Sequence, residues 1–140
     1  MNWQPKVLIV EDQTLVALCL TEVLNETGHE VVGVAPTVHD ALNLAANTNP
    51  DVAVVDVRLR GEADGLEGAQ LLRQQFGLSI IFLTAQADLE TKERAAAVDP
   101  VGFLHKPVHP SKLVQAISAA VGNGRRKPNP WSEPAKDRGR

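Results

Sequence analysis

The chain has 140 residues, of which 44% are hydrophobic and 22% charged, with a formal net charge of −3. This balance suits one ordinary globular domain with its own core. No apolar run reaches the roughly 18 residues that a membrane span needs, and a single cysteine, Cys19, excludes an internal disulfide. We therefore expect a cytoplasmic protein that does not enter a membrane.

The net charge combines two parts of opposite sign. Residues 122–140 hold six cationic side chains against two carboxylates, a balance of +4, which leaves −7 for residues 1–121. An acidic body does not favour nucleic-acid binding. The last stretch is rich in proline and glycine, with Trp131 as its one large apolar residue. We expect a folded domain at 1–121 and a flexible basic tail at 122–140.

Short apolar runs alternate with amphipathic stretches from residue 6 to residue 121. We predict strands at 6–10, 30–35, 52–56, 79–84 and 101–105, and helices at 13–27, 38–48, 65–76, 87–97 and 110–121. Gly28 stands where the first helix should end in a left-handed residue. Five strand–helix units in a row predict an α/β fold, namely an open doubly wound parallel sheet whose site lies at the carboxyl ends of its strands.

Polar residues lie at the end of four predicted strands or directly after it. In chain order these are Glu11, Asp12, Asp56, Thr84 and Lys106. Because the carboxyl ends of parallel strands lie on one edge of a sheet, these side chains should converge. Carboxylates this close repel one another unless a cation joins them. The pattern predicts a divalent-metal site with a reactive aspartate, Asp56, at its centre.

Magnesium prefers oxygen ligands and keeps several waters. Asp12 and Asp56 as direct ligands, Glu11 through a water, and one backbone carbonyl would match that preference. A carboxylate can attack phosphorus when a metal and a cation neutralise the phosphoryl oxygens. The structural alternatives are a turn-capping Asp56 and an Asp12 that caps the helix starting near Gln13.

The other two polar residues would serve a phosphoryl group. The Thr84 hydroxyl could donate to one of its oxygens, and the Lys106 ammonium could bridge it to the carboxylates. A cis peptide between Lys106 and Pro107 would aim the lysine inward, but the sequence leaves the isomer open. Of the four histidines, His105 and His109 flank this step, so one could lie near the site. No G-x-x-x-x-G-K loop occurs, so we expect the phosphoryl group to come from another molecule.

Four segments resemble the receiver domain of two-component response regulators, and together they span about residues 5–121. They are Val-Leu-Ile-Val-Glu-Asp at 7–12, Asp-Val-Ala-Val-Val-Asp at 51–56, Ile-Ile-Phe-Leu-Thr-Ala at 80–85 and Gly-Phe-Leu-His-Lys-Pro at 102–107. The resemblance implies a flavodoxin-like sheet of five parallel strands in the order 2-1-3-4-5. It also implies two helices on one face and three on the other.

The resemblance further implies that Asp56 is the phosphoacceptor for a phosphohistidine on a histidine kinase or a phosphotransfer protein. Asp12, Asp56 and the backbone carbonyl of Arg58 would hold Mg²⁺. Thr84 and Lys106 would contact the phosphoryl oxygens, together with the backbone N–H groups of Arg58 and Ala85.

A switch residue and several departures from the family complete the resemblance. Phe103 matches the family's switch aromatic, which packs inward when the threonine moves toward the phosphoryl group. The loop at 59–65 replaces the usual Met-Pro and carries extra charge, so the resemblance leaves the loop conformation and the choice of partner open. Asp99-Pro100 replaces the usual Gly-Ala before the fifth strand. Arg58 and Gln86 occupy places that influence how fast the phosphoryl group is lost.

Several functions follow as alternatives. The first is a stand-alone signalling receiver whose output is a protein–protein contact. The second is the receiver of a longer regulator whose effector domain is missing here. A metal-dependent phosphatase of the aspartyl-phosphate kind is less favoured, since such enzymes generally carry an acid two positions after the nucleophile, where this chain has Arg58. We therefore expect no enzyme beyond self-phosphotransfer and auto-dephosphorylation. A receiver-like fold that no longer takes phosphate is disfavoured by the intact polar set.

Two surfaces are candidates for partner contacts. The helix at 13–27 lies beside the predicted site, and we expect it to be a docking surface for a kinase or phosphotransfer helix. Its residues Leu15, Leu18 and Cys19 are either exposed apolar contacts for that partner or part of the edge of the core. A homodimer through the face formed by residues 87–121 is an alternative that the sequence leaves open.

Overall fold

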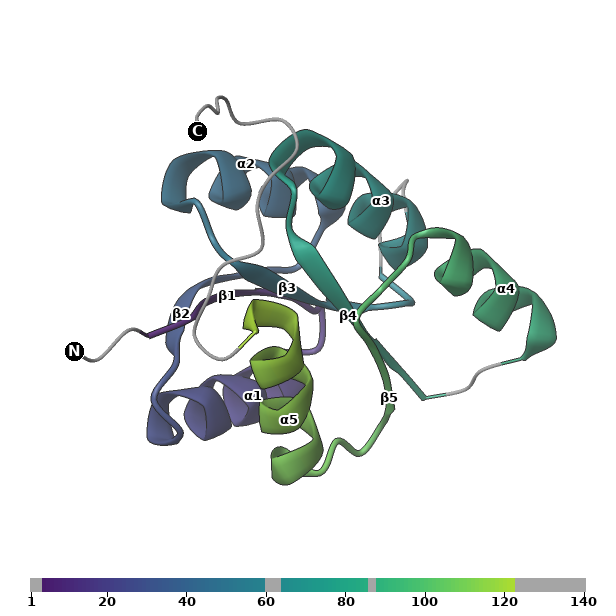
Figure 1. Ribbon diagram of the computed structural model, residues 1–140. Coiled ribbons are helices and arrows are strands. Elements are labelled where there is room, and N and C mark those ends of the chain that lie inside the picture. The colour runs from purple at the N-terminus through teal and green to yellow at the C-terminus, as the bar shows by residue number, and fades with distance from the viewer. Residues whose placement is uncertain (1–3, 60–63, 86–87, 123–140) are drawn as a thin grey trace.

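The computed structural model describes residues 4–59, 64–85 and 88–122, in which five strands alternate with five helices (Figure 1). The strands are β1 (Lys6–Val10), β2 (Glu30–Ala35), β3 (Val52–Asp56), β4 (Ser79–Thr84) and β5 (Gly102–His105). The helices are α1 (Thr14–Glu26), α2 (Val38–Thr48), α3 (Gly65–Phe76), α4 (Leu89–Ala97) and α5 (Pro110–Val121). Seven of these ranges match the predicted ones; α1 is shorter by one residue at each end, and α4 and β5 start later.

The strands form one parallel sheet in the order β2-β1-β3-β4-β5, which confirms the predicted flavodoxin-like order. The register of β1 on β3 runs from Val7 opposite Val52 to Val10 opposite Val55. The residues that follow Val10 therefore lie level with the end of β3. This is the switch point of the sheet, because the chain leaves β1 toward β2 and then crosses back to β3.

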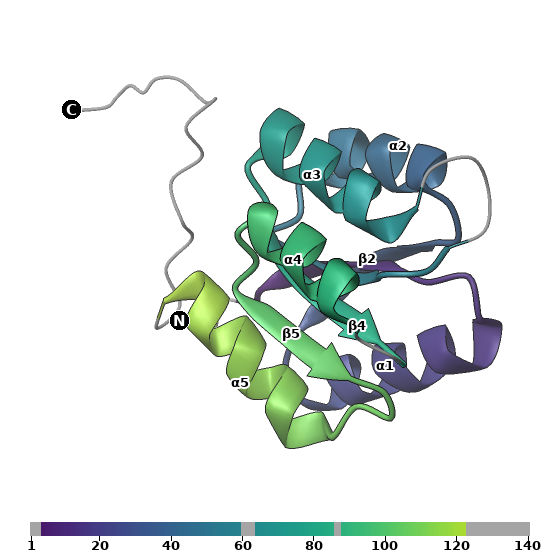
Figure 2. The ribbon, with the colours of Figure 1, turned by 90° about the vertical axis from the view of Figure 1, so that its right-hand side faces the viewer.

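Helices cover both faces of the sheet (Figure 2), and the two buried clusters assign two helices to one face and three to the other, as expected. Leu20 and Leu24 of α1 pack with Leu113 and Ile117 of α5 over one face. The helices α2, α3 and α4 cover the opposite face through buried side chains that include Ala41, Ala45, Leu66, Leu72 and Ala95. Burying each Leu or Ile side chain stabilises the fold by about 1.5–3 kcal/mol, so the two apolar layers hold the sheet edge in place.

Side-chain caps mark the start of four helices, and that of α5 is provided by His109. Thr37, Asp64 and Asp88 accept hydrogen bonds from the backbone N–H groups of the first turns of α2, α3 and α4. The interpretation of Asp12 as a helix cap is wrong, because Gln13 occupies the N-cap position of α1 and makes no side-chain cap. Gly28, with φ of 85°, follows α1 in the left-handed conformation that was predicted for it.

Some predictions fall outside the described residues. These concern residues 60–63 of the charged loop, Gln86, and the basic tail beyond Gly122 with Trp131. Among the helices that the structure describes, none is both long and apolar enough to cross a bilayer.

Candidate functional site

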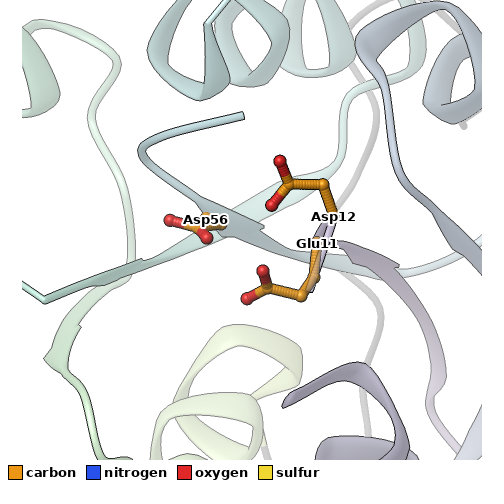
Figure 3. Close-up of side chains that lie close together, drawn as sticks. All are labelled: Glu11, Asp12 and Asp56. Atoms are coloured by element: carbon orange, nitrogen blue, oxygen red, sulfur yellow. The ribbon is translucent and has the colours of Figure 1, made fainter. Parts of the chain in front are cut away.

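The carboxyl ends of β1 and β3 bring three carboxylates together. Glu11 and Asp12 follow β1, and Asp56 is the last residue of β3 (Figure 3). One carboxylate oxygen from each lies within 4.8 Å of the others. Glu11 and Asp56 are only 2% and 5% exposed, whereas Asp12 is half-buried. The cluster therefore opens toward solvent at Asp12.

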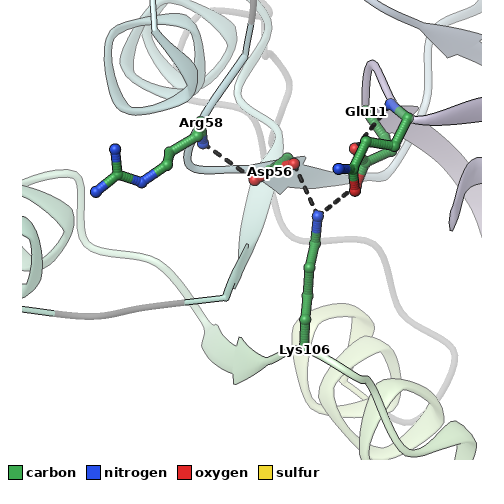
Figure 4. A network of polar contacts seen from close by, with 5 residues as sticks. Glu11, Asp56, Arg58 and Lys106 are labelled. Atoms are coloured by element: carbon green, nitrogen blue, oxygen red, sulfur yellow. Dashed lines mark hydrogen bonds and ion pairs between the residues drawn. The ribbon is translucent and has the colours of Figure 1, made fainter.

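Lys106 directly follows the edge strand β5 and forms ion pairs with two of these carboxylates. Its Nζ donates to Asp56 Oδ2 at 2.8 Å and to Glu11 Oε1 at 2.9 Å (Figure 4). Its backbone N–H donates to the carbonyl of Thr84 at 2.8 Å, so β4 fixes where the lysine leaves β5. The Lys106–Pro107 peptide is cis.

The second oxygen of each bridged carboxylate accepts a backbone N–H. Gln13 donates to Glu11 Oε2, and Arg58 donates to Asp56 Oδ1, both at 3.0 Å. Each carboxylate is thus held at both oxygens, by the lysine and by the chain that follows it. The Arg58 side chain itself points away from the carboxylates (Figure 4).

The electrostatics of the site follow from this packing. Burial raises the pKa of Glu11, and the hydrogen bond from Lys106 opposes that effect only in part. Burial alone would lower the pKa of Lys106, but the hydrogen bonds and attraction of Asp56 and Glu11 outweigh it and raise the pKa above its ordinary value. Lys106 therefore stays cationic at neutral pH.

The donor set fits magnesium. Among residues 4–59, 64–85 and 88–122, this is the one group of acidic, imidazole or thiol side chains close enough to share an ion. All its donors are carboxylate oxygens, which hard cations such as Mg²⁺ prefer. One ammonium cannot neutralise three carboxylates, so an additional divalent charge would relieve their repulsion.

The remaining predicted residues surround the cluster. Thr84 ends β4 and is buried. Phe103 is half-buried and meets the rings of Phe82 and His105 edge-on, with centroids 6.3 and 6.0 Å away. Ala85 follows Thr84 at the surface. The metal contact of the Arg58 carbonyl and the phosphoryl contact of the Ala85 N–H stay predictions.

The two neighbouring histidines have different places. His109 is the N-cap of α5, where its Nδ1 accepts from the N–H of Ser111 at 3.2 Å. His105 is exposed at the end of β5 and contacts Phe103. Neither belongs to the carboxylate cluster. Sequence analysis did not single out Gly65, whose N–H donates to the carbonyl of Val57 and whose missing β-carbon would collide with the carbonyl of Asp56. The only signal for it was a glycine at the predicted start of a helix.

Comparison with known proteins identifies the class. A family model of the response regulator receiver domain matches residues 7–118, so the chain belongs to that family. The receiver domain is the phosphorylated module of two-component signalling, and receivers generally bind Mg²⁺ at an acidic pocket, the kind of pocket that Glu11, Asp12 and Asp56 form here.

Individual relatives agree with the family. The transcriptional regulatory protein PdtaR of Mycobacterium tuberculosis is 35% identical over 120 residues, which cover 86% of this chain and 58% of PdtaR. The phyllosphere-induced regulator PhyR of Methylorubrum extorquens is 31% identical over 118 residues, which cover 83% of this chain and 43% of PhyR. The chain thus spans about half the length of these relatives.

Solved structures show the same fold. The signal receiver domain of a modulated diguanylate cyclase from Desulfovibrio desulfuricans G20 superposes with a TM-score of 0.82 at 40% identity, covering 86% of this chain and 96% of that one. The chemotaxis protein CheY4 of Vibrio cholerae superposes with a TM-score of 0.76 at 28% identity, covering 84% of this chain and 98% of CheY4.

Proposed function

We propose that this chain is a magnesium-dependent phosphoacceptor switch, in which Asp56 accepts a phosphoryl group from a phosphohistidine on a histidine kinase or a phosphotransfer protein. The observation that carries the proposal is the double contact of Lys106 with Asp56 and Glu11, beside the third carboxylate of Asp12. In the transfer an Asp56 oxygen forms a bond to phosphorus, the phosphorus–nitrogen bond of the donor breaks, and neutral histidine leaves after taking up a proton.

The carboxylates have separate tasks in this proposal. Asp12 and Asp56 would hold Mg²⁺ directly, Glu11 would reach it through a water, and the Arg58 carbonyl would complete the protein ligands. The ion would neutralise phosphoryl oxygens as they approach the carboxylates. The backbone N–H of Arg58 donates a hydrogen bond to Asp56 Oδ1, which supports the assignment of this N–H as a donor to the phosphoryl oxygens.

Lys106 and Thr84 complete the environment of the phosphoryl group. The ammonium would follow the charge from the free carboxylate to the phosphoryl oxygens, and the Thr84 hydroxyl and the Ala85 N–H would donate to the same oxygens. The backbone hydrogen bond from Lys106 to Thr84 supports the proposal that these two residues respond together to the phosphoryl group. The same contacts would assist later hydrolysis, so auto-dephosphorylation belongs to the proposal.

Output would pass through the face formed by α4, β5 and α5. Phe103 lies in β5 between two rings and is half-buried, which supports its role as the switch aromatic that follows Thr84. The change is a shift between two packings, biased by their different contacts with the phosphoryl group. The output is then a protein–protein contact, with a homodimer through the 87–121 face as one form; residue 87 itself lies outside the described residues.

We propose no turnover of external substrates. An aspartyl-phosphate phosphatase would use an acid two positions after its nucleophile, and Arg58 stands there with its side chain turned away (Figure 4). One cysteine, Cys19, suits a reducing compartment, so we place the protein in the cytosol.

A receiver that belongs to a longer regulator is the second candidate. The curated relatives extend well beyond the matched region, since 120 matched residues are 58% of PdtaR. An effector activity would then depend on residues that are not part of this sequence. The length of the encoding reading frame distinguishes this candidate from a stand-alone receiver.

We propose that the phosphohistidine partner docks on α1. A groove of about 280 Å³ runs between α1 and the start of α5, and Lys106 forms its end nearest the site. Its lining is apolar and includes Leu15 and Leu20 of α1 and Leu113 of α5. Leu15 and Leu18 are 73% and 61% exposed, so α1 offers an apolar ridge for the helix that carries the phosphohistidine.

The docking proposal predicts a donor-dependent defect in Leu15→Arg. Transfer from a phosphorylated kinase or phosphotransfer protein that serves the wild type should slow by about tenfold or more, because a buried apolar contact is lost. Phosphorylation by a small phosphodonor should not change. Leu89→Arg is the matched control, since Leu89 is 71% exposed on α4. Equal transfer rates for both variants would exclude the α1 ridge.

The phosphoacceptor proposal is tested by intact-mass measurement after incubation with a small phosphodonor. We expect the wild type to gain one phosphoryl group in the presence of Mg²⁺ and Asp56→Asn to gain none. Equal phosphoryl incorporation in Asp56→Asn would exclude Asp56 as the acceptor.

A further inference from the structure

Gly65 brings the start of α3 into contact with the backbone of the phosphoacceptor. Its N–H donates to the carbonyl of Val57 at 3.0 Å, which closes the loop that leaves β3. A β-carbon on Gly65 would lie 1.8 Å from the carbonyl oxygen of Asp56, 2.8 Å from its carbonyl carbon and 2.9 Å from the carbonyl oxygen of Val57. All three are backbone atoms, so no side-chain rotation can make room.

Packing and hydrogen bonds fix both the start of α3 at Gly65 and the Asp56–Val57 segment that it faces. Behind Gly65, Leu66 and Leu72 anchor α3 in the core. On the strand side, Val57 donates its N–H to Leu83 of β4 at 2.9 Å. A β-carbon at position 65 would have to push these backbones apart by roughly 1 Å to reach the 3.0 Å below which such contacts are essentially never seen.

Such a displacement would reach the carboxylate of Asp56. Its Oδ1 is tied to the N–H of Arg58 in the same loop, and its Oδ2 is tied to Lys106. Arg58 would move with the displaced peptide, whereas Lys106, which follows β5, would not. A shift of the Asp56–Val57 peptide therefore changes the place of the carboxylate relative to Lys106, Asp12 and Glu11.

Gly68 provides the contrast within the same helix. A β-carbon there would lie 2.7 Å from Cγ2 of Val38, a methyl group on α2 that can move with its side chain. Both glycines are buried residues of α3. Of these two positions, only 65 is one where an added β-carbon would collide with the backbone of the proposed acceptor.

We infer that Gly65 is a positioning residue for the phosphoacceptor, because its missing side chain lets α3 sit against the Asp56 carbonyl and keeps the carboxylate aligned with the metal and phosphoryl site. This inference rests on the proposed function.

The test compares Gly65→Ala with Gly68→Ala and the wild type. Circular dichroism gives the folded fraction, isothermal titration calorimetry gives the Mg²⁺ dissociation constant, and intact mass gives the rate of phosphorylation by a small phosphodonor. Because misplacing reacting groups by about 1 Å can cost on the order of 100-fold, we expect Gly65→Ala to lose at least about tenfold in both Mg²⁺ affinity and rate. Gly68→Ala should keep both within about twofold at equal folded fraction, since it leaves the Asp56 backbone in place.

The outcomes separate the inference from the function beneath it. A folded Gly65→Ala that matches Gly68→Ala, with a phosphorylated wild type, overturns the inference alone. A wild type that neither binds Mg²⁺ nor takes the phosphoryl group overturns the proposed function and the inference with it. If Gly65→Ala does not fold, amide spectra of the wild type decide: saturating Mg²⁺ should shift the Gly65 resonance and leave that of Gly68 in place, and an unmoved Gly65 resonance overturns the inference.

Discussion

At Lys106 a single ammonium group compensates two carboxylates that come from different strands. Breaking a buried ion pair by removing one partner costs about 3–5 kcal/mol, because the other charge stays buried. An exposed pair contributes only about 0–1 kcal/mol. The described pairs Arg73–Asp99 and Arg94–Asp64 are exposed, whereas Glu11 and Asp56 are almost fully buried. Among the cationic side chains of these pairs, we therefore expect Lys106 to have the largest effect on stability.

We predict that Lys106→Gln lowers the free energy of unfolding at neutral pH by on the order of 3 kcal/mol in the absence of Mg²⁺. Phosphorylation by a small phosphodonor should slow by about 100-fold, since a preorganised donor to the phosphoryl oxygens is lost. Urea denaturation and intact-mass kinetics measure the two effects. Lys112→Gln, an exposed lysine on α5, is the control. Equal losses in both variants would contradict the central place of Lys106.

The sequence predicts these polar residues because each one stands at the end of an apolar strand. Once Val10 and Val55 are partners in a parallel sheet, Glu11 and Asp56 must be neighbours. The backbone N–H that each carboxylate accepts and the close approach of Gly65 to Asp56 could not be predicted. They depend on the path of a loop, and no residue pattern encodes that path.

At the scale of the elements, Asp64 joins two helices. Its Oδ1 accepts the N–H of Glu67 at 2.9 Å and caps α3, while its Oδ2 accepts Arg94 of α4 at 3.0 Å. One side chain thereby fixes the start of α3, next to the Gly65 contact, and ties it to a helix of the proposed output face.

We predict that Asp64→Asn and Asp64→Ala separate these two roles. Asparagine keeps a capping oxygen and loses the ion pair, at a cost of at most about 1 kcal/mol that disappears at high salt. Alanine should cost about 1 kcal/mol more at every salt concentration, because the cap is lost as well. Urea denaturation at low and high salt measures both. Identical losses in the two variants would contradict the capping role.

Element boundaries followed the sequence where local chemistry marks them. The predicted range of α2, 38–48, holds because Thr37 caps one end and Asn49, with φ of 53°, terminates the other. The first helix was predicted one residue too long at each end, since Gln13 and Thr27 serve as its caps and lie outside its regular turns. Strand β5 starts at Gly102, one residue later than predicted, after a segment in which Asp99 has φ of 61°.

At the scale of the whole molecule, stability should depend on pH through His29. This residue lies where α1 turns into β2, is buried, and contacts the hydroxyl of Thr27. Burial lowers its pKa below the ordinary value of 6.5, and a hydrogen bond with Leu24 offsets this only in part. The unfolded chain therefore takes up a proton at a higher pH than the folded one, so stability is greatest above about 6.5 and falls as the pH drops through the folded pKa.

We predict that His29→Gln reduces the pH dependence of the free energy of unfolding between neutral pH and the lowered pKa of His29. His39→Gln, an exposed position on α2, is the control for the loss of an imidazole. Urea denaturation across this range compares the slopes. A wild-type slope in His29→Gln would show that the proton uptake belongs to other groups.

The overall architecture was the most predictable feature, because alternating apolar strands and amphipathic helices admit few arrangements.

The proposed function depends on Asp56, which ends the central strand β3. The most direct test is to trap the acyl phosphate by borohydride reduction after phosphorylation and to locate the modified residue by peptide mass spectrometry, with and without a chelator. We predict modification at Asp56 alone and only with Mg²⁺ present. Modification at another carboxylate, or at Asp56 with equal yield in the chelated sample, would contradict the proposed function.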